Sequence, residues 1–598
     1  MTDQIVIAPI LVALTTAVLT LLTRFDGRVE KAVSVGGAVA YAVAAAALAN
    51  AVLLAPGGPA TLTYGVSNWQ APFGIVLVAD ALSTFMIVLA APIVVAAAVY
   101  SVVSVDEAGQ RLSYHPLYHF MMLGVSGAFL TGDVFNLFVW FEVMLMSSYV
   151  LVLFYSGREH TRAALGYVVL NLLASALMLV AIGGLYATTG TLNMADMARR
   201  LADPAAYGVA LAPTLGLGAL LLAVFALKAG LVPFHFWVPS AYRAAPAPVT
   251  AMLAGVVKKV GVYAVIRLFF TVFGGATYAT TSTFAYVGPV LVVLAAASIL
   301  LGGVGAVGRE DVDGLLAFSS IGQVGFIVLP LGAAMIAPDA ATRLAGGETT
   351  LAAVGVAAAL VYSLTHAIAK PLLFLASGTI RSALGSTAFS QLGGLARRTP
   401  LLAGAYLIGG LALVGVPPVL GFFGKLLVFR TVTEGLAVGV TSAGAMAAVM
   451  LVGAVLTIAY VTRGWNAVFW GPPSERVRTL IPERWGRSRY AGDAPDATGG
   501  ADTVSPDGGP STVTDRALVV QVAVIVALAL SLVALGVGAD AVVDGATDAA
   551  HAAIDTGSYV DAVGPAEPGT DYHPAGDGGG ESDETHSLAA AWLGGGDP

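Results

Sequence analysis

The most informative stretch of this sequence is FALKAGLVPFHFWVPSAY, residues Phe225–Tyr242, in which a lysine interrupts an apolar run just before several prolines. The lysine is Lys228, and the first prolines after it are Pro233 and Pro239. Proline removes a backbone donor and kinks a helix, and at membrane depth this is tolerated only inside protein or along a wet cavity. The stretch therefore predicts a broken transmembrane helix with a charged group beside the break.

The composition of the whole chain indicates that it contains many transmembrane helices. Of the 598 residues, 57% are hydrophobic and only 11% are charged, whereas a soluble chain has roughly a quarter of its residues charged. This excludes a soluble enzyme, a fibrous protein and a disordered chain, and it leaves a polytopic membrane protein. Cysteine is absent, so disulfides, thiolate metal sites and cysteine-ligated iron–sulfur clusters are excluded as well.

Continuous apolar runs of the length that a bilayer requires predict an all-α polytopic membrane protein with about 14 transmembrane helices. Runs of this kind favour helices over the ten-residue alternation of an outer-membrane barrel. The predicted spans are Ile5–Thr23, Ala32–Ala55, Phe73–Val103, Tyr118–Thr131, Val134–Tyr155, Ala163–Thr188, Ala210–Val232, Val249–Thr271, Phe284–Val307, Val312–Ala334, Thr350–Ile380, Leu401–Arg430, Val440–Thr462 and Ala517–Val537.

Loop charges predict the orientation of these helices. If both termini lie outside, the inner loops carry 18 arginines and lysines and the outer loops carry 4, which is the bias expected for a cell (plasma) membrane protein. The net charge of −8 belongs to residues 541–598, which hold 11 acidic side chains and no Lys or Arg. We expect this acidic tail to be disordered. Nothing in the charge pattern suggests a nucleic-acid partner.

Charged residues inside the predicted spans are the main functional signal. A charge at the centre of a bilayer costs at least about 2.5 kcal/mol, and such residues usually face the bundle interior and mark an ion path. Glu142 and Asp80 are the clearest buried acids, and Arg267 is expected to snorkel to the interface because it lies near a helix end. The basic residues within spans are Lys228, Lys258, Lys259, Arg267, Lys370 and Lys425. The alternative is that these charges only hold helices together.

A second interrupted helix resembles the first. Lys425 follows Pro417-Pro418 and Gly421, and two lysine-bearing, proline-interrupted helices five spans apart are typical of an inverted repeat. We therefore predict two inverted five-helix repeats, with helices 7 and 12 broken. The predicted divisions are 1–103 (three helices), 104–272 (helices 4–8), 273–470 (helices 9–13), 471–516 (a basic, then Gly/Asp-rich linker), 517–540 (the last helix) and 541–598 (the tail).

Several other polar residues carry less weight. His366 and Lys370 are four residues apart and share a helix face, and GLLAFSSIGQVGFIV offers Ser319, Ser320 and Gln323 but no counterpart of Glu142. His115 and His119 also share a face, where a wet interfacial pair is favoured over a metal site. Gly303-x-Gly305-x-x-Gly308 matches a dinucleotide fingerprint only as a string, since no strand precedes it. No cofactor and no metal are expected.

Six motifs, in order along the chain, carry a family resemblance. They are TGDVFNLFVWFEVMLMSSYVL (Thr131–Leu151), FALKAGLVPFHFWVPSAY (Phe225–Tyr242), KVGVYAVIR (Lys259–Arg267), GLLAFSSIGQVGFI (Gly314–Ile327), THAIAKPLLFLASG (Thr365–Gly378) and GFFGKLLVF (Gly421–Phe429). With them the chain resembles the proton-conducting antiporter-like family, which includes the large subunits of Mrp-type cation/proton antiporters and the membrane-arm subunits of complex I. The resemblance runs from about Asp80 to Trp470.

The resemblance implies a 14-helix fold with two inverted repeats and a hydrated axis of charged residues at mid-membrane. It places Glu142 as the glutamate of helix 5, Lys228 as its partner lysine and Lys259 as the lysine of helix 8. Lys258 points about 100° away from Lys259 on a helix, so we assign it and Ser320 accessory roles at most. Three residues complete the implied proton path on helices 11 and 12: His366, Lys370 and Lys425. Asp80 matches a family motif of unassigned role.

The resemblance also implies the function. The motif around Glu142 and the presence of Ser240, where complex I relatives commonly carry Asp, favour an Mrp-type D subunit. It would act as a transporter subunit and not as an enzyme, together with other subunits of a hetero-oligomeric Na⁺/H⁺ antiporter. The alternatives are a proton-pumping subunit of an NADH or other quinone oxidoreductase, and a passive scaffold. Whether Na⁺ itself crosses this chain, and in which direction ions flow, stays open.

Overall fold

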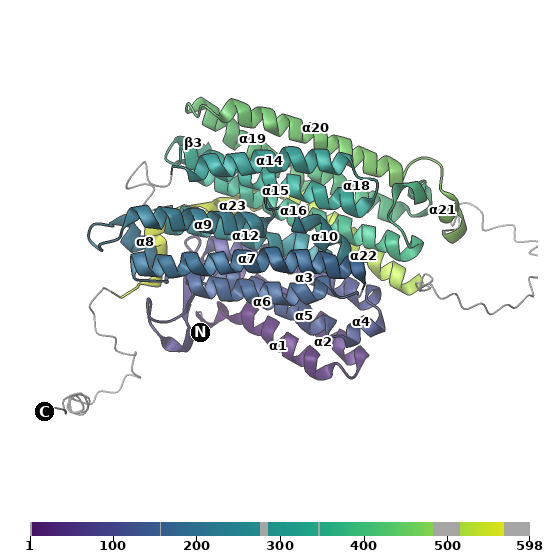
Figure 1. Cartoon of the computed structure of the whole chain (residues 1–598), viewed down its shortest axis with the longest axis horizontal. Coiled ribbons are helices and arrows are strands. Elements are labelled where there is room, and N and C mark those ends of the chain that lie inside the picture. Colours follow the sequence, from purple (N-terminus) through teal and green to yellow (C-terminus); the bar gives the residue numbers. More distant parts are fainter. Residues whose placement is uncertain (1–2, 156, 275–284, 345–346, 482–514, 567–598) are drawn as a thin grey trace, which may run out of the picture.

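The structure is a computed structural model and describes residues 3–566 except 156, 275–284, 345–346 and 482–514. Most of its helices run side by side along the long axis of the molecule (Figure 1). One end of this bundle carries the short helix α8 (Met194–Ala202), and the opposite end carries α4 (Glu107–Arg111) and α21 (Glu475–Leu480). We refer to them as the α8 end and the α4 end.

The predicted spans are present as helices. Within the described residues, eleven helices are long and apolar enough to cross a membrane. They are α2 (Gly27–Val52), α3 (Ala81–Ser104), α6 (Val134–Val152), α7 (Arg158–Thr189), α9 (Leu211–Ala229), the rod Ala247–Val272, α14 (Val287–Val307), α15 (Val312–Ile336), α16 (Leu351–Leu384), α20 (Ala443–Val468) and α22 (Asp515–Val537). The other spans correspond to α1 (Ala8–Thr23), α5 (Tyr114–Leu130), and the pair α18 (Pro400–Val414) and α19 (Leu420–Ala437). The all-α polytopic fold is therefore confirmed.

The remaining elements are short. Two antiparallel hairpins are formed by β1 (Leu62–Gly65) with β2 (Val76–Ala79), and by β3 (Ala341–Leu344) with β4 (Gly347–Thr350). The other short helices are α10 (Trp237–Ala244), α17 (Leu395–Arg398), α23 (Ala539–Ile554) and α24 (Thr556–Val563), with 3₁₀ turns η1 (Asp3–Ile5), η2 (Val66–Asn68) and η5 (Phe389–Gln391).

The predicted break in helix 7 lies between α9 and α10. Gly230 ends α9 in a left-handed conformation, with φ +73°, which glycine adopts without a Cβ penalty. Two backbone groups near the break find partners. The Trp237 indole donates to the Leu227 carbonyl at 3.0 Å, and the Val232 amide donates to the Ser298 hydroxyl at 2.9 Å. The break is thus held open by specific hydrogen bonds.

The predicted break in helix 12 lies between α18 and α19. Gly415, with φ +90°, ends α18, and the helix does not resume until Leu420, after Pro417-Pro418. From the sequence we expect Leu401–Arg430 to be one interrupted span, and the structure divides it at this point. Both breaks therefore confirm the interrupted helices that the Gly and Pro positions predict.

The centre of the bundle is the rod of residues 247–272. It consists of α11 (Ala247–Met252), the π-turn η3 (Leu253–Val257), α12 (Lys258–Ile266) and the π-turn η4 (Arg267–Val272). The apolar stretch of the rod is 100% buried inside the protein, and the apolar stretches of α15 and α16 are 94% buried. Every face of the rod contacts protein, so its charged side chains point at other helices and not at lipid. π-turns inside helices are frequent at functional sites.

One span starts later than the sequence predicts. We expect the third span to begin at Phe73, but residues 76–79 form β2 and α3 begins at Ala81. Asp80 is the N-cap of α3, and its Oδ1 atom accepts a hydrogen bond from the Ser83 amide at 2.8 Å. An aspartate that satisfies free amides in this way is a strong helix start. Asp80 therefore lies at the α8 end of its helix and not in the middle of a span.

The expectation of a disordered tail after residue 540 is wrong for its first part. Residues 539–563 form α23 and α24, which pack on α16, α3 and η4. The reason is an apolar face of small residues at helical spacing: Ala546, Ala549, Ala550 and Ala553 are completely buried. The abundant aspartates occupy the rest of the helix surface. Residues 567–598 lie outside the described part of the chain.

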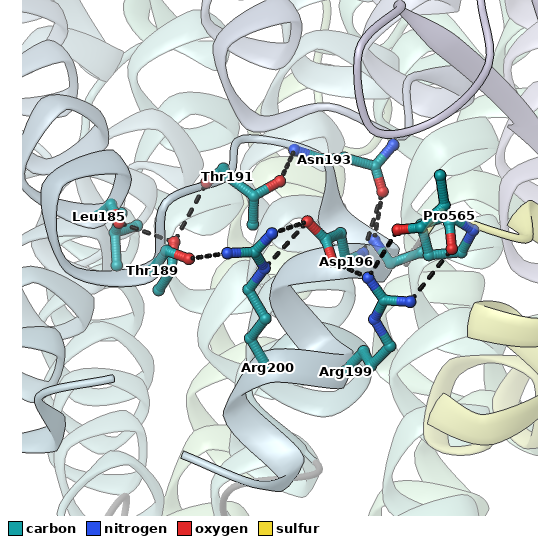
Figure 2. Close-up of polar contacts among 10 residues, drawn as sticks. Leu185, Thr189, Thr191, Asn193, Asp196, Arg199, Arg200 and Pro565 are labelled. Atoms are coloured by element: carbon teal, nitrogen blue, oxygen red, sulfur yellow. Dashed lines mark hydrogen bonds and ion pairs between the residues drawn. The ribbon is translucent and has the colours of Figure 1, made fainter. Parts of the chain in front are cut away.

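The end of this C-terminal segment is anchored to α8. Arg199 donates to the Pro565 carbonyl at 3.1 Å (Figure 2) and to the Ala566 carbonyl at 3.0 Å. Both Arg199 and Arg200 pair with the buried carboxylate of Asp196 at 2.6 and 3.0 Å. A segment that composition alone predicts to be disordered is thus held by charge-assisted hydrogen bonds.

Candidate functional site

Glu142 on α6 and Lys228 in the last turn of α9 are neighbours without a direct ion pair between these two described residues. Lys228 is 4% exposed, and its ammonium donates to the Ser175 hydroxyl at 3.1 Å and to the Asn171 carbonyl at 3.5 Å, both on α7. It lies 5.6 Å from the centre of the Phe141 ring, and the Glu142 carboxylate is the opposite charge that acts on it. Oε1 of Glu142 is buried without a hydrogen-bond partner among the described residues. The lysine therefore points toward α7.

Lys258 occupies the helix break. A Cβ built on Gly230 would lie 3.1 Å from the Lys258 Nζ atom. The side chain is completely buried, its ammonium has no hydrogen-bond partner in the described part of the chain, and it lies 5.8 Å from the centre of the Tyr242 ring. From the sequence, Lys258 ranks below Lys259. The structure places its ammonium beside Gly230 and buries the side chain as completely as that of Lys259.

Lys259 and His366 are in direct contact. The Lys259 Nζ atom lies 2.5 Å from Nδ1 of His366 on α16 and donates to the Ala254 carbonyl at 2.6 Å. Nε2 of the same imidazole lies 3.4 Å from the Ser320 hydroxyl on α15. Lys259 and His366 are both completely buried. The imidazole thus connects a base on the central rod with a hydroxyl on the next helix.

Lys370 lies one turn from His366 and turns toward the same neighbouring helix. Its ammonium donates to the Leu316 carbonyl at 2.9 Å and to the Ser319 hydroxyl, both on α15. The predicted shared face of His366 and Lys370 is thus present, with adjacent serines of α15 as the partners of the two residues.

Lys425 lies at the second break. Its ammonium donates to the carbonyl of Val414, the last residue of α18, at 3.2 Å, and it lies 4.7 Å from the centre of the Phe326 ring. A Cβ on Gly415 would lie 3.0 Å from the Lys425 Cδ atom. Each break of the bundle therefore has a lysine side chain against its glycine, Lys258 at the first and Lys425 at the second.

A polar cluster near Lys425 was not assigned from the sequence. Gln323 donates to the Tyr460 hydroxyl at 2.6 Å and to the Thr457 hydroxyl at 3.2 Å, and it accepts a hydrogen bond from Tyr362. The Tyr362 ring lies 6.2 Å from the Phe326 ring that Lys425 covers. Gln323 stands out in an apolar helix as a sequence signal, whereas a tyrosine in such a helix gives no signal of its own.

Asp80 and Arg267 form a buried ion pair away from this line of bases. The Nη2 atom of Arg267 lies 2.7 Å from both carboxylate oxygens, and the side chains are only 1% and 2% exposed. The expectation that Arg267 snorkels is therefore wrong. It meets a carboxylate inside the protein because α3 starts at Asp80, next to the rod.

The other sequence candidates have structural explanations. His115 and His119 are 0% and 2% exposed and bind the two sides of the Ser34 hydroxyl at 2.9 and 3.0 Å, so the expected wet interfacial pair is dry. Among the described residues, no group of three or more His, Cys, Asp or Glu could hold a metal ion.

The α4 end of the bundle is hollowed below the first break. A cavity of about 760 Å³ is lined by His160, Ser240, Arg243, Asp313, Arg381 and other residues. Ser240 lies on α10, which leads from the break to this end. Water that fills this cavity would therefore reach one half of the broken helix.

The arrangement has a clear chemical consequence. Like charges repel strongly in a low-dielectric interior, so bases packed this closely cannot all hold a proton at once. A proton taken up by one of them disfavours protonation of its neighbours, and the Ser319 and Ser320 hydroxyls and the His366 imidazole contact members of this group. The line runs from α6 to α19, and its members are buried except for the partly buried residues at its two ends: Glu142, Lys228, Lys258, Lys259, His366, Ser320, Lys370 and Lys425. Ionisable residues inside a membrane bundle usually mark an ion path.

Comparisons with known proteins agree with this arrangement. A family model described as "NADH:quinone oxidoreductase/Mrp antiporter, TM" matches residues 131–451. The chain is 36% identical over 406 residues to the D subunit of the Na⁺/H⁺ antiporter of Alkalihalophilus pseudofirmus, covering 68% of this chain and 76% of the relative. It is 35% identical over 505 residues to the N subunit of the NADH-quinone oxidoreductase of Desulforudis audaxviator, covering 82% and 91%.

A solved structure shares the fold over nearly the whole chain. A chain in the structure of the Mrp complex from Dietzia sp. superposes with a TM-score of 0.76 at 29% identity, covering 94% of this chain and 99% of that one. The matched family segment contains both helix breaks and every residue of the line from Glu142 to Lys425. This multi-pass membrane protein therefore belongs to the family of membrane subunits that NADH:quinone oxidoreductases and Mrp antiporters share.

Proposed function

We propose that the chain is the proton-translocating subunit of a multisubunit Mrp-type Na⁺/H⁺ antiporter in the cell membrane. The observation that carries this proposal is the line of buried bases between the two helix breaks, with one acid at its α6 end. The name of the Alkalihalophilus relative, the D subunit of a Na⁺/H⁺ antiporter, and the likeness to a chain of an Mrp complex support the same conclusion.

The elementary step would be a change of partner at Lys228. When Glu142 approaches, its negative charge stabilises the protonated lysine. When it withdraws, Lys228 turns to the neutral oxygens of Ser175 and Asn171, as described above, and gives up its proton more easily. The neighbouring acceptor along the line is Lys258, whose ammonium lies in the break without a hydrogen-bond partner among the described residues. Repulsion from each arriving charge then favours release at the following base.

The second half of the path would use the contacts around α16. Lys259 passes its proton to His366 across 2.5 Å, and the imidazole faces Ser320 on its other side. Lys370 and then Lys425 would follow. We propose that the α4 end faces the cytoplasm, because the positive-inside rule places both termini outside. The cavity at that end would then supply or receive cytoplasmic protons.

A proton-gradient assay in everted membrane vesicles tests the function. The host should lack its own antiporters and should express the complete set of subunits. Respiration acidifies the vesicle interior, and added Na⁺ should collapse this gradient if the complex is an antiporter. Vesicles that contain all subunits except this one provide the control. An unchanged gradient after Na⁺ addition to the complete complex would contradict the proposal.

A redox-driven pump is the second candidate, and the similarity to the N subunit of an NADH-quinone oxidoreductase over 82% of this chain favours it. In that case the chain would conduct protons within an NADH- or other quinone oxidoreductase, and its partners would provide the driving force. The same vesicles separate the two functions. NADH should create a proton gradient that depends on this chain in a pump, whereas Na⁺ should dissipate one in an antiporter.

Substituting Gly230 by alanine should impair transport much more than the same change at Gly216. A Cβ at Gly230 would lie 2.8 Å from Val238 Cγ2 and 3.1 Å from Lys258 Nζ, at a positive φ of +73°. The left-handed conformation costs roughly 1–2 kcal/mol with a side chain, and the Lys258 ammonium must move. Gly216, on the same helix, has nothing within 4 Å of a built Cβ. Transport rates of the two variants at matched expression measure the difference, and equal rates would show that the geometry of the break does not matter.

A further inference from the structure

Asp80, the acid of the Asp80–Arg267 pair, lines a cavity at the α8 end. The cavity has a volume of about 280 Å³, which is enough for several water molecules. Asp80 lines it although only 2% of this residue is exposed, and Asp548, His551 and Asp555 line its walls. Since Arg267 neutralises Asp80, the carboxylates of Asp548 and Asp555 make this opening attractive to small cations and to hydronium.

The walls of this cavity belong largely to the C-terminal segment. Tyr559 of α24 lies over the Arg267 guanidinium, 4.9 Å from it, and is 3% exposed. Tyr559 lines the cavity, and its hydroxyl is buried without a hydrogen-bond partner in the described part of the chain, a state that normally has a cost unless water or an ion reaches the group. Arg267 is therefore closed in from two sides, by Asp80 and by the ring of Tyr559.

Specific bonds hold the segment over the pair. Thr271, in the same π-turn as Arg267, donates to the Ala553 carbonyl at 2.7 Å and accepts at its own carbonyl from Thr556 at 2.9 Å. At the far end, the bonds of Arg199 to Pro565 and Ala566 fasten the segment to α8 (Figure 2). The segment thus forms a cap that is attached on both sides of the cavity.

The pair also belongs to the helix that carries the central lysine. Lys259, Tyr263 and Arg267 recur at intervals of four residues and share one face of the rod. Arg267 therefore lies about 12 Å along the axis from Lys259, at 1.5 Å per residue. Between them the Tyr263 hydroxyl bonds to Arg267 Nε at 3.2 Å, to Ser83 at 3.2 Å and to the Phe129 carbonyl at 2.8 Å.

We propose that this cavity is the outer mouth of the proton axis, that the Asp80–Arg267 pair is its gate, and that α23–α24 form a cap that keeps the gate shut. Water and hydronium from the outside enter beside Asp548 and Asp555 and stop at the ion pair. When the cap loosens, Arg267 moves away from Asp80. Water then reaches the hydroxyls of Tyr263 and Ser83, on the side of the rod that carries Lys259. The proposal rests on the proposed function of the axis and names its connection to the outside.

Cysteine accessibility tests this gate without measuring transport, because the chain has no cysteine of its own. Ser83 is 1% exposed and lies behind the pair, whereas Ser558 is exposed and lines the cavity. In the complete complex in whole cells, a membrane-impermeant cationic thiol reagent should label S558C quickly and S83C slowly. Combining S83C with Tyr559→Ala should accelerate its labelling at least about tenfold. Tyr559→Phe, which keeps the ring over Arg267, should not.

The controls separate opening of the gate from general loosening. Ser101 is equally buried at the other end of α3, and S101C should stay unreactive in every background. Arg199→Ala, which releases the far end of the cap, provides a second variant remote from the pair and should also accelerate S83C. Labelling of S83C that is equally slow in all cap variants, or that occurs only from the cytoplasmic side, would overturn the proposal. If the labelling pattern holds while no proton flux is found, the proposed function fails, and what stands is a cavity whose access to Ser83 is controlled by the cap.

Discussion

Lys228→Ala should abolish Na⁺-dependent proton movement while leaving the subunit in its complex. The side chain is the base that stands between Glu142 and the break, and alanine offers nothing that can hold a proton there. Lys31 provides a matched control, because it is the one lysine of this chain outside the buried line. Lys31→Ala should transport at close to the parental rate. Gradient collapse in everted vesicles, normalised to the amount of assembled subunit, measures both variants.

The same measurement of gradient collapse should be made on variants of Glu142. Glu142→Ala removes the counter-charge, and Glu142→Gln keeps the size of the side chain, so both should abolish transport if the charge itself is required. Glu434→Gln is the control, since Glu434 forms a partly exposed pair with Arg430 at 3.6 Å, and such surface pairs contribute little. Parental transport rates in Glu142→Gln or in Lys228→Ala would contradict their roles and would favour the interpretation that these charges only hold helices together.

How much of this site the sequence predicts depends on whether a signal is local. Both helix breaks follow from glycine and proline positions close in the chain, and the buried lysines are visible because a charge in an apolar run is unusual. The ranking of Lys259 over Lys258 rests on an assumption about the helix that carries them. An angle of 100° separates the two lysines only on a helix with one inward face, but the rod that carries them is surrounded by protein on every side, so both directions lead inward.

The features that the sequence does not predict depend on partners far along the chain. Arg267 meets Asp80, which is 187 residues away in sequence, and an isolated helix gives no indication of such a partner. The C-terminal segment is mispredicted for a different reason. Its Asp and Gly content indicates disorder, while the alanines at 546, 549, 550 and 553 form a narrow apolar face that only matters because α3 and α16 offer a surface for it.

The buried ion pair leads to the second large expected effect, which concerns stability. Arg267→Met should destabilise the protein by roughly 3–5 kcal/mol, because it leaves the Asp80 carboxylate buried without a counter-charge. Asp80→Asn should have a similar cost, since it leaves the guanidinium uncompensated. Asparagine is nevertheless as good an N-cap as aspartate, so this change preserves the start of α3. The two single variants therefore separate the effect of the lost charge on stability from the effect of losing the N-cap of α3.

Combining the two changes should recover most of the loss. Arg267→Met with Asp80→Asn removes both charges and keeps the capping oxygen, and a neutral buried pair often replaces an ionic one at little cost. The thermal stability of the detergent-solubilised complex measures all three variants. Arg343→Gln is the control, because Arg343 and Glu348 are 74% and 89% exposed and 3.9 Å apart, and it should change nothing. If the double variant is as unstable as the single ones, the hydrogen bonds of Arg267 to Tyr263 and Ser83 stabilise this end of the bundle more than the pairing of charges, and the gate would open by breaking those bonds first.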